Sequence, residues 1–187
     1  MISWLARRTL ALLGWRLEGT LPTAPKIVII AAPHTSNWDF PYAMLLAFAY
    51  RLRINFMMKD ELFRPPWGWF FRALGGIPIN RRARNNVVDQ MVARIRESER
   101  MQLVIPPEGT RSKVTAWKTG FYYIALAAGV PIVLGFLDFR RKVGGFGPAI
   151  MPSGDLEADL EQIRAFYSGV TGRRPENFGT ITTTRAE

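Results

Sequence analysis

The sequence predicts an α/β fold: a mixed, partly parallel central sheet with helices on both faces, preceded by an amphipathic N-terminal helix. The chain has 187 residues, enough for one full hydrophobic core and short for two. Hydrophobic residues make up 48% of it, which is typical of a packed globule. Short apolar runs alternate with helical patterns, and strands that are apolar throughout indicate a sheet covered on both faces. We therefore expect one domain spanning residues 1–187.

The N-terminal segment, residues 1–17, has the pattern of a short basic helix. Trp4 and Trp15 lie near its two ends, and Arg7, Arg8 and Arg16 interrupt its apolar residues. The arginines argue against a secretory signal, and no stretch reaches the roughly 20 apolar residues of a membrane span. Two interpretations remain open: a helix lying in a membrane interface, where Trp and Arg are both favourable, or an amphipathic helix packed on the domain's own core.

The central part of the chain supplies the sheet and its covering helices. Five runs rich in Ile and Val predict strands, at 26–32, 53–58, 75–79, 102–106 and 131–139. Four segments between them predict helices, at 39–50, 65–74, 85–98 and 119–129. After these, the acidic segment 155–172 predicts a closing helix that ends around Gly169.

The charge distribution predicts a phosphate-bearing partner. The 25 Lys and Arg residues outnumber the 15 Asp and Glu residues, and the excess lies in residues 1–148. Twenty of the 25 cations are Arg, whose planar group makes bidentate contacts to phosphate. A field of this sign attracts nucleic acid, anionic lipid or a phosphorylated small molecule, and composition does not choose among them.

Cysteine is absent and histidine occurs once, at position 34. Disulfides and thiol catalysis are therefore excluded, and we expect no metal site because zinc is held mainly by Cys and His. His34 directly follows the first apolar run, in "PHTSNWD", and Asp39 comes five positions later. Across a strand-to-helix turn, where Thr35, Ser36 or Asn37 could cap the helix, the carboxylate can reach one ring nitrogen and leave the other free as a general base. The alternative is a structural histidine bonded within its own loop.

Other polar motifs lie at further strand ends, where ligands collect in open α/β sheets. "IPPEGTRS" carries Glu108 beside a glycine and Arg111, which can bind a phosphate; an ordinary solvated turn has the same composition. "GGIPINRR" places Arg81 and Arg82 after a strand, and Lys118 precedes an apolar helix.

Together, "HTSNWD", "GGIPINR", "PEGTRS" and "GVPIV" resemble, in order and spacing, the four sequence blocks of the glycerolipid acyltransferases, the lysophosphatidic acid acyltransferase-like enzymes. The resemblance covers roughly residues 15–140 and is most specific in the first and third blocks. It implies a single acyltransferase domain that moves a fatty acyl group from acyl-CoA or acyl-carrier protein to the hydroxyl of a glycerophosphate-type acceptor such as lysophosphatidic acid, without a further cofactor.

The resemblance also implies roles for individual residues. His34 would be the general base, and Asp39 would orient it. The acceptor and its phosphate would be held by Arg81, Glu108, Gly109, Thr110 and Arg111, and the acyl groove would be lined or supported by Val130, Pro131 and Ile132. Block two lacks its usual aromatic and acidic residues, and Pro106 stands where block three often has an aromatic, so another lysolipid or a lyso-aminolipid stays open as acceptor.

An enzyme of this kind works on a bilayer, and two segments predict interfacial contact: residues 1–17, and "RPPWGWFFRAL", with Trp67, Trp69 and Phe70 between arginines. We therefore expect a monotopic protein on the cytoplasmic leaflet, attracted to anionic headgroups. The alternatives are a hydrolase that uses His34 to activate water, and a non-catalytic module for anionic lipid or nucleic acid. No nucleic-acid motif is present, and we expect no nucleic-acid partner.

Overall fold

A computed structural model describes residues 1–79, 87–179, 181 and 182, and within these ranges it contains one seven-stranded sheet. The strand order is β1-β7-β6-β2-β5-β3-β4, and every neighbouring pair is parallel except β6 and β7. The strands are β1 (Arg16–Glu18), β2 (Lys26–Ala31), β3 (Ile54–Lys59), β4 (Gly76–Ile79), β5 (Met101–Ile105), β6 (Ile132–Asp138) and β7 (Val143–Ile150). The helices are α1 (Ile2–Leu12), α2 (Asp39–Ala49), α3 (Gly68–Ala73), α4 (Val87–Glu97), α5 (Gly120–Ala128) and α6 (Leu156–Tyr167), with short 3₁₀ turns at Asp60–Phe63 and Pro175–Asn177. The predicted mixed sheet is confirmed.

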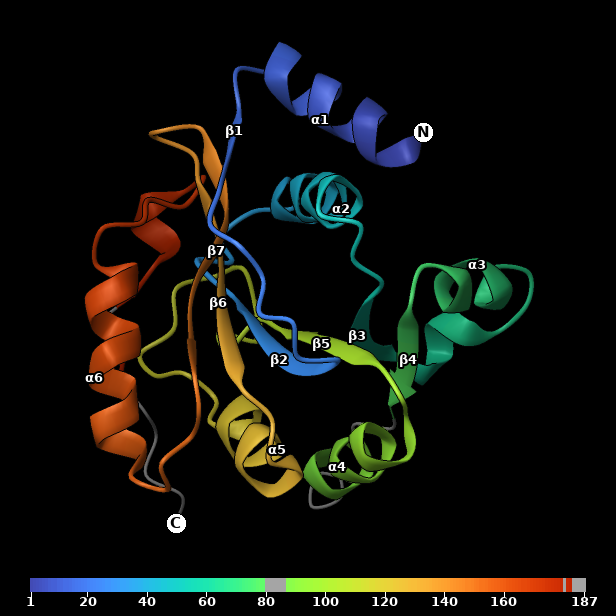
Figure 1. Ribbon diagram of the computed structural model, residues 1–187, viewed down its shortest axis with the longest axis vertical. Coiled ribbons are helices and arrows are strands. Elements are labelled where there is room, and N and C mark those ends of the chain that lie inside the picture. The colour runs from blue at the N-terminus through green and yellow to red at the C-terminus, as the bar shows by residue number, and fades with distance from the viewer. Residues whose placement is uncertain (80–86, 180, 183–187) are drawn as a thin grey trace.

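Helices cover both faces of this sheet, as the apolar strands predict (Figure 1). On one face α2 lies against the sheet and α1 packs on α2; on the other lie α4, α5 and α6. The four inner residues of β2, Ile27 to Ile30, are at most 3% exposed, because both of their faces are covered. The main core lies between β2, β5 and β6 and the helices α4, α5 and α6.

The central strands β2 and β5 are neighbours, yet the chain leaves them toward opposite faces. After β2 it enters α2 on one face, and after β5 it runs to α5 on the other. Such a reversal opens a crevice outside the carboxyl ends of the strands. The segments after Ala31 and after Ile105 both lie at this crevice.

The sequence analysis missed β1 and β7. The segment of β7 holds three glycines and a proline, which are depleted in strands. Its glycines are needed for close approach: a Cβ on Gly145 would lie 1.8 Å from the carbonyl oxygen of Glu18 in β1, and one on Gly147 would lie 2.3 Å from the ring of Phe166 in α6. These contacts depend on distant segments, so periodicity within the strand does not reveal them.

The N-terminal helix is shorter than the predicted 1–17 and has two distinct sides. It ends at Leu12, and Trp15 lies beyond it, 5% exposed, against the rings of Tyr42 and Phe139. Trp15 is therefore a core residue, which corrects its prediction as an interfacial anchor. Ala6 and Leu10 are buried in the same cluster, whereas Trp4 on the outer side is 61% exposed. In the described part of the chain, no helix combines the length and apolarity needed to cross a bilayer.

Candidate active site

His34 and Asp39 are in contact at the carboxyl end of β2. Nδ1 of His34 lies 3.2 Å from Oδ2 of Asp39, as the strand-to-helix turn predicts. The aspartate side chain is 6% exposed and that of the histidine 19%. Nδ1 thus faces a buried carboxylate, which leaves Nε2 as the ring nitrogen available to a substrate. A carboxylate at one ring nitrogen is the arrangement in which a histidine can act as a general base through the other.

The loop between the two residues is held by the same carboxylate. Oδ2 of Asp39 also accepts the backbone N–H groups of Thr35, at 2.7 Å, and Ser36, at 2.8 Å. The expected capping of α2 by a Thr35, Ser36 or Asn37 side chain is confirmed only in part: Oγ of Ser36 accepts the N–H of Trp38, the residue before α2, at 3.2 Å. Trp38 is the N-terminal cap and makes no side-chain cap bond to the helix, while Asp39, in the first turn, binds backward to the loop. Asp39 therefore positions His34 through the backbone as well as through its ring.

Glu108 approaches His34 from β5 and is 3% exposed. Its Oε1 accepts the backbone N–H of His34 at 3.0 Å, and its Oε2 is buried with no hydrogen-bond partner in the described structure. Burial raises the pKa of this carboxyl above its usual range, against the lowering effect of the His34 N–H. The structure thus places this predicted acceptor-binding residue against the backbone of His34.

A cavity of about 1010 Å³ opens beside the His34–Asp39 pair. This volume is at the upper end of the roughly 300–1,000 Å³ of small-molecule sites. Its walls are mostly apolar and run along α2 from Asp39 to Ala47, about 12 Å at the helical rise. The sheet contributes side chains from the six strands β2 to β7, among them Ile29, Ile54, Phe56, Val104 and Leu137, and α4 and α5 contribute further apolar residues. The cavity is thus mostly apolar and reaches His34 and Asp39.

Two cations, Arg111 and Lys118, are exposed and line the same cavity as His34. Gly109 has φ +65°, and a Cβ there would lie 3.0 Å from Nζ of Lys118. Glycine at this position thus permits both the turn and the lysine contact. Thr110 is exposed, and its Oγ1 accepts the N–H of Ser112 at 3.4 Å. An anion beside His34 would therefore meet two positive charges.

The other predicted site residues lie elsewhere. Arg81 falls outside the described residues. Val130, Pro131 and Ile132 are at the amino end of β6, opposite to the His34 end of the sheet, and they do not line the cavity. Val130 and Ile132 are buried in the main core, so the structure places them in support of the sheet and corrects their alternative prediction as groove lining. In the described residues, no group of three His, Cys, Asp or Glu side chains could hold a metal ion.

The sequence analysis did not find the residues of α2 and β3 that line the cavity, nor assign a role to Lys118. Apolar residues at helical or strand spacing ordinarily belong to the core. The residues of α2 and β3 line a cavity instead, because α2 leaves space above the sheet. The one available signal was the apolar composition of 39–50, which exceeds what one buried helix face requires.

The fold and the site together define an α/β domain in which a histidine–aspartate pair borders a mostly apolar cavity that two cations, Arg111 and Lys118, also line. The Acyltransferase family model matches residues 16–133, which include His34, Asp39, Glu108, Arg111 and Lys118. The chain belongs to the Acyltransferase family.

Relatives of the chain carry a common name. The 1-acyl-sn-glycerol-3-phosphate acyltransferase of Haemophilus influenzae is 27% identical over 138 residues, 67% of this chain and 55% of that protein. Those of Escherichia coli and Streptococcus pneumoniae are 28% and 30% identical, over 54% and 42% of their own lengths and 67% and 56% of this chain. The chain thus spans about half the length of the curated relatives it matches.

A solved structure shares the fold. The 1-acyl-sn-glycerophosphate (LPA) acyltransferase PlsC from Thermotoga maritima matches with a TM-score of 0.64 and 19% identity, over 90% of this chain and 77% of that one. The architecture described above is therefore that of a known acyltransferase structure.

Proposed function

We propose that this protein transfers a fatty acyl group from a thioester, acyl-CoA or acyl-carrier protein, to the hydroxyl of a glycerophosphate-type acceptor such as lysophosphatidic acid. The observation that carries the proposal is the position of the His34–Asp39 pair, between an apolar cavity and two cations. The cavity suits the acyl chain, and Arg111 with Lys118 suits the acceptor's phosphate. The names of the relatives agree with this substrate class.

The chemistry follows from the two ring nitrogens of His34. Nε2 takes the proton of the acceptor hydroxyl as its oxygen attacks the thioester carbonyl carbon, and Asp39 balances the charge of the resulting imidazolium. The tetrahedral intermediate then collapses, the carbon–sulfur bond breaks, and the imidazolium returns its proton to the leaving thiolate. No covalent acyl-enzyme is required, in keeping with a chain that has no cysteine.

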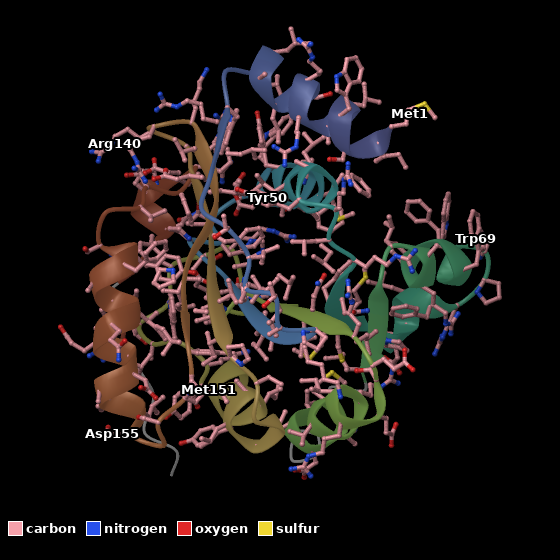
Figure 2. All side chains as sticks on the ribbon, in the orientation of Figure 1. Met1, Tyr50, Trp69, Arg140, Met151 and Asp155 are labelled. Carbon is pink, nitrogen blue, oxygen red and sulfur yellow. The ribbon has the colours of Figure 1, made fainter. Side chains whose placement is uncertain are left out.

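The protein would act at a membrane, where both its lipid substrate and product reside. Two exposed groups of apolar side chains suit this position, and we call them together the aromatic face: Ile2, Trp4, Leu5 and Leu12 on α1, and Trp67, Trp69 and Phe70 on or next to α3. In Figure 2, Met1 at the start of α1 and Trp69 on α3 both project outward on the same side of the view. Arg8 lies 5.3 Å from the ring of Trp4, and Arg72 is exposed on α3, so cations accompany the aromatic rings. We infer peripheral binding to the cytoplasmic, anionic leaflet.

The test is a turnover assay with labelled acyl-CoA or acyl-carrier protein and a panel of lysolipids, repeated with His34→Ala. We expect acylated lipid that requires both the acceptor and His34. Release of free fatty acid alone would identify a hydrolase instead, and near-normal activity of His34→Ala would exclude the proposed base. The panel also identifies the acceptor, because a lysolipid without phosphate loses its contact with Arg111 and Lys118.

A further inference from the structure

The segment that follows α6, Thr171 to Thr182 without the undescribed position 180, lies against the active site although it is beyond the family match at residues 16–133. We call this segment the C-terminal strap. It carries none of the sequence motifs, and nothing in the proposed chemistry uses it. Its hydrogen bonds nevertheless go to the two loops that carry the site residues.

The first contact of the strap is with Thr35, the neighbour of His34. The backbone N–H of Arg174 donates to Oγ1 of Thr35 at 3.1 Å, and Nδ2 of Asn177 donates to the Thr35 carbonyl at 3.4 Å. Thr35 is 1% exposed, and its own N–H donates to Asp39 Oδ2. The strap therefore binds a buried residue that lies next to His34 and is itself bonded to the carboxylate of Asp39.

Packing at this contact leaves no room for a larger strap residue. Gly172 is buried, and a Cβ there would lie 2.8 Å from Oγ1 of Thr35 and 3.1 Å from Cβ of Pro33. Since both neighbours belong to the loop of His34, any side chain at position 172 displaces that loop or the strap. Close packing of this kind transmits small displacements, because interiors have few voids to absorb them.

The second contact of the strap is with the loop that carries Lys118. The N–H of Trp117 donates to the carbonyl of Thr182 at 2.7 Å, and Oγ1 of Thr182 donates to the carbonyl of Thr115 at 2.6 Å. Lys118 in turn donates its N–H to the carbonyl of Pro107 at 2.9 Å, next to Glu108, whose carboxylate holds His34. The contacts form a closed ring. Thr35, next to His34, binds the strap, and the strap binds Trp117, whose neighbour Lys118 binds the carbonyl of Pro107. Glu108, next to Pro107, then accepts the N–H of His34.

We propose that the C-terminal strap is a positioning element of the active site, which sets the orientation of the His34–Asp39 pair through Thr35 and its position relative to Lys118 through Trp117. The inference rests on the proposed function for its kinetic consequence, but the ring of contacts is a separate claim. Gly172, Arg174 and Asn177 act through Thr35, so they are positioning residues that do not touch substrate.

The experiment compares Gly172→Ala with Gly169→Ala. A Cβ on Gly169 would meet no atom within 4 Å, and neither glycine has a positive φ, so the two variants share the backbone effect of the substitution and differ in the clash. For Gly172→Ala we expect kcat to fall roughly 10- to 100-fold, the scale of a misplaced catalytic group, with both KM values within about threefold of wild type. Gly169→Ala should match wild type.

A second pair guards against a folding defect. Thr35→Val keeps the shape of the side chain but removes the acceptor of the Arg174 N–H, and Thr35→Ser restores it. We expect kcat to fall in Thr35→Val and to recover in Thr35→Ser. Equal kcat in Gly172→Ala and Gly169→Ala, a loss confined to KM, or equal activity of the two Thr35 variants would each overturn the proposal.

Hydrogen exchange separates failure of the strap from failure of the proposed function. The amides of Thr35 and Ser36 donate to Asp39, and we expect them to exchange faster in Gly172→Ala than in Gly169→Ala. If the amides of Thr35 and Ser36 exchange equally fast in both variants, the proposed ring of contacts is wrong, even if the enzyme is active. A wild-type protein that is inactive with every acceptor overturns the proposed function. Faster exchange of these amides in Gly172→Ala than in Gly169→Ala would still support the role of the strap.

Discussion

The charge of Asp39 can be tested apart from its shape by Asp39→Asn. The amide oxygen can occupy the position of Oδ2 and still accept the N–H groups of Thr35 and Ser36 and the Nδ1–H of His34. The amide nitrogen then takes the place of Oδ1, which has no hydrogen-bond partner in the described structure. The loop therefore keeps its hydrogen bonds, at the cost of two amide N–H donors in a buried place that shows no acceptor. For the chemistry, what disappears is the negative charge beside the imidazolium.

The size of the loss follows from the distance. Two unit charges separated by 3.2 Å interact by about 5 kcal/mol at an effective dielectric constant of about 20. Because the His34 side chain is 19% exposed, water weakens this, and we take roughly 2.5–5 kcal/mol of transition-state stabilisation. At about 1.4 kcal/mol per factor of ten, kcat should fall roughly 10²- to 10⁴-fold.

Asp138→Asn is the matched control in the kinetic assay. Asp138 is fully buried, and its Oδ1 accepts the N–H groups of Arg140 and Arg141. Its Oδ2 accepts the Nε–H of Arg141 at 2.7 Å, and it does not line the cavity. Both variants weaken two backbone bonds to a carboxylate, and Asp138→Asn also loses the ion pair with Arg141. We expect both variants to lower the denaturant midpoint and only Asp39→Asn to lower kcat. A kcat within about threefold of wild type for that variant would refute imidazolium stabilisation by Asp39.

Four further predictions concern the surroundings of the site. Burial raises the pKa of Glu108 above its unfolded value of about 4.3, so the wild-type protein loses stability as the pH rises above that value. Glu108→Gln removes the titrating group, and its unfolding free energy should therefore rise relative to that of wild type above pH ~4.3, by at most about 1.4 kcal/mol per pH unit. Denaturant titrations at several pH values measure this difference. Ala47→Phe fills the cavity along α2 and should lower kcat/KM for long acyl thioesters more than for short ones; equal losses would place the chain elsewhere. Trp4→Ala combined with Trp69→Ala should weaken co-sedimentation with anionic vesicles without changing turnover of a short-chain soluble substrate, and unchanged vesicle binding would exclude the aromatic face. Gly145→Ala forces a contact with the Glu18 carbonyl and should lower the free energy of unfolding by about 1–3 kcal/mol, measured by thermal denaturation; an unchanged Tm would contradict this packing.

Pattern and spacing sufficed for the centre of the fold. The strands β2 to β6 consist of Ile- and Val-rich runs between helical segments, and such runs are buried on both faces wherever they lie in a parallel sheet. The contact of His34 with Asp39 was also predictable, because both residues belong to one turn between a strand and a helix. The buried strands and the His34–Asp39 contact could be predicted because each depends on residues that lie close together in the sequence.

The edges of the fold and the support of the site depend on segments distant in the chain. The sequence alone determined an α/β protein with a histidine–aspartate pair and cations after its strands. Only the tertiary structure turned the apolar side of α2 into a cavity wall, buried Trp15 between Tyr42 and Phe139, and brought Glu108 and the C-terminal strap to the loop of His34. The physical reason is that burial and hydrogen bonding depend on which surfaces meet in space, and no local periodicity records a partner 74 or 139 positions away.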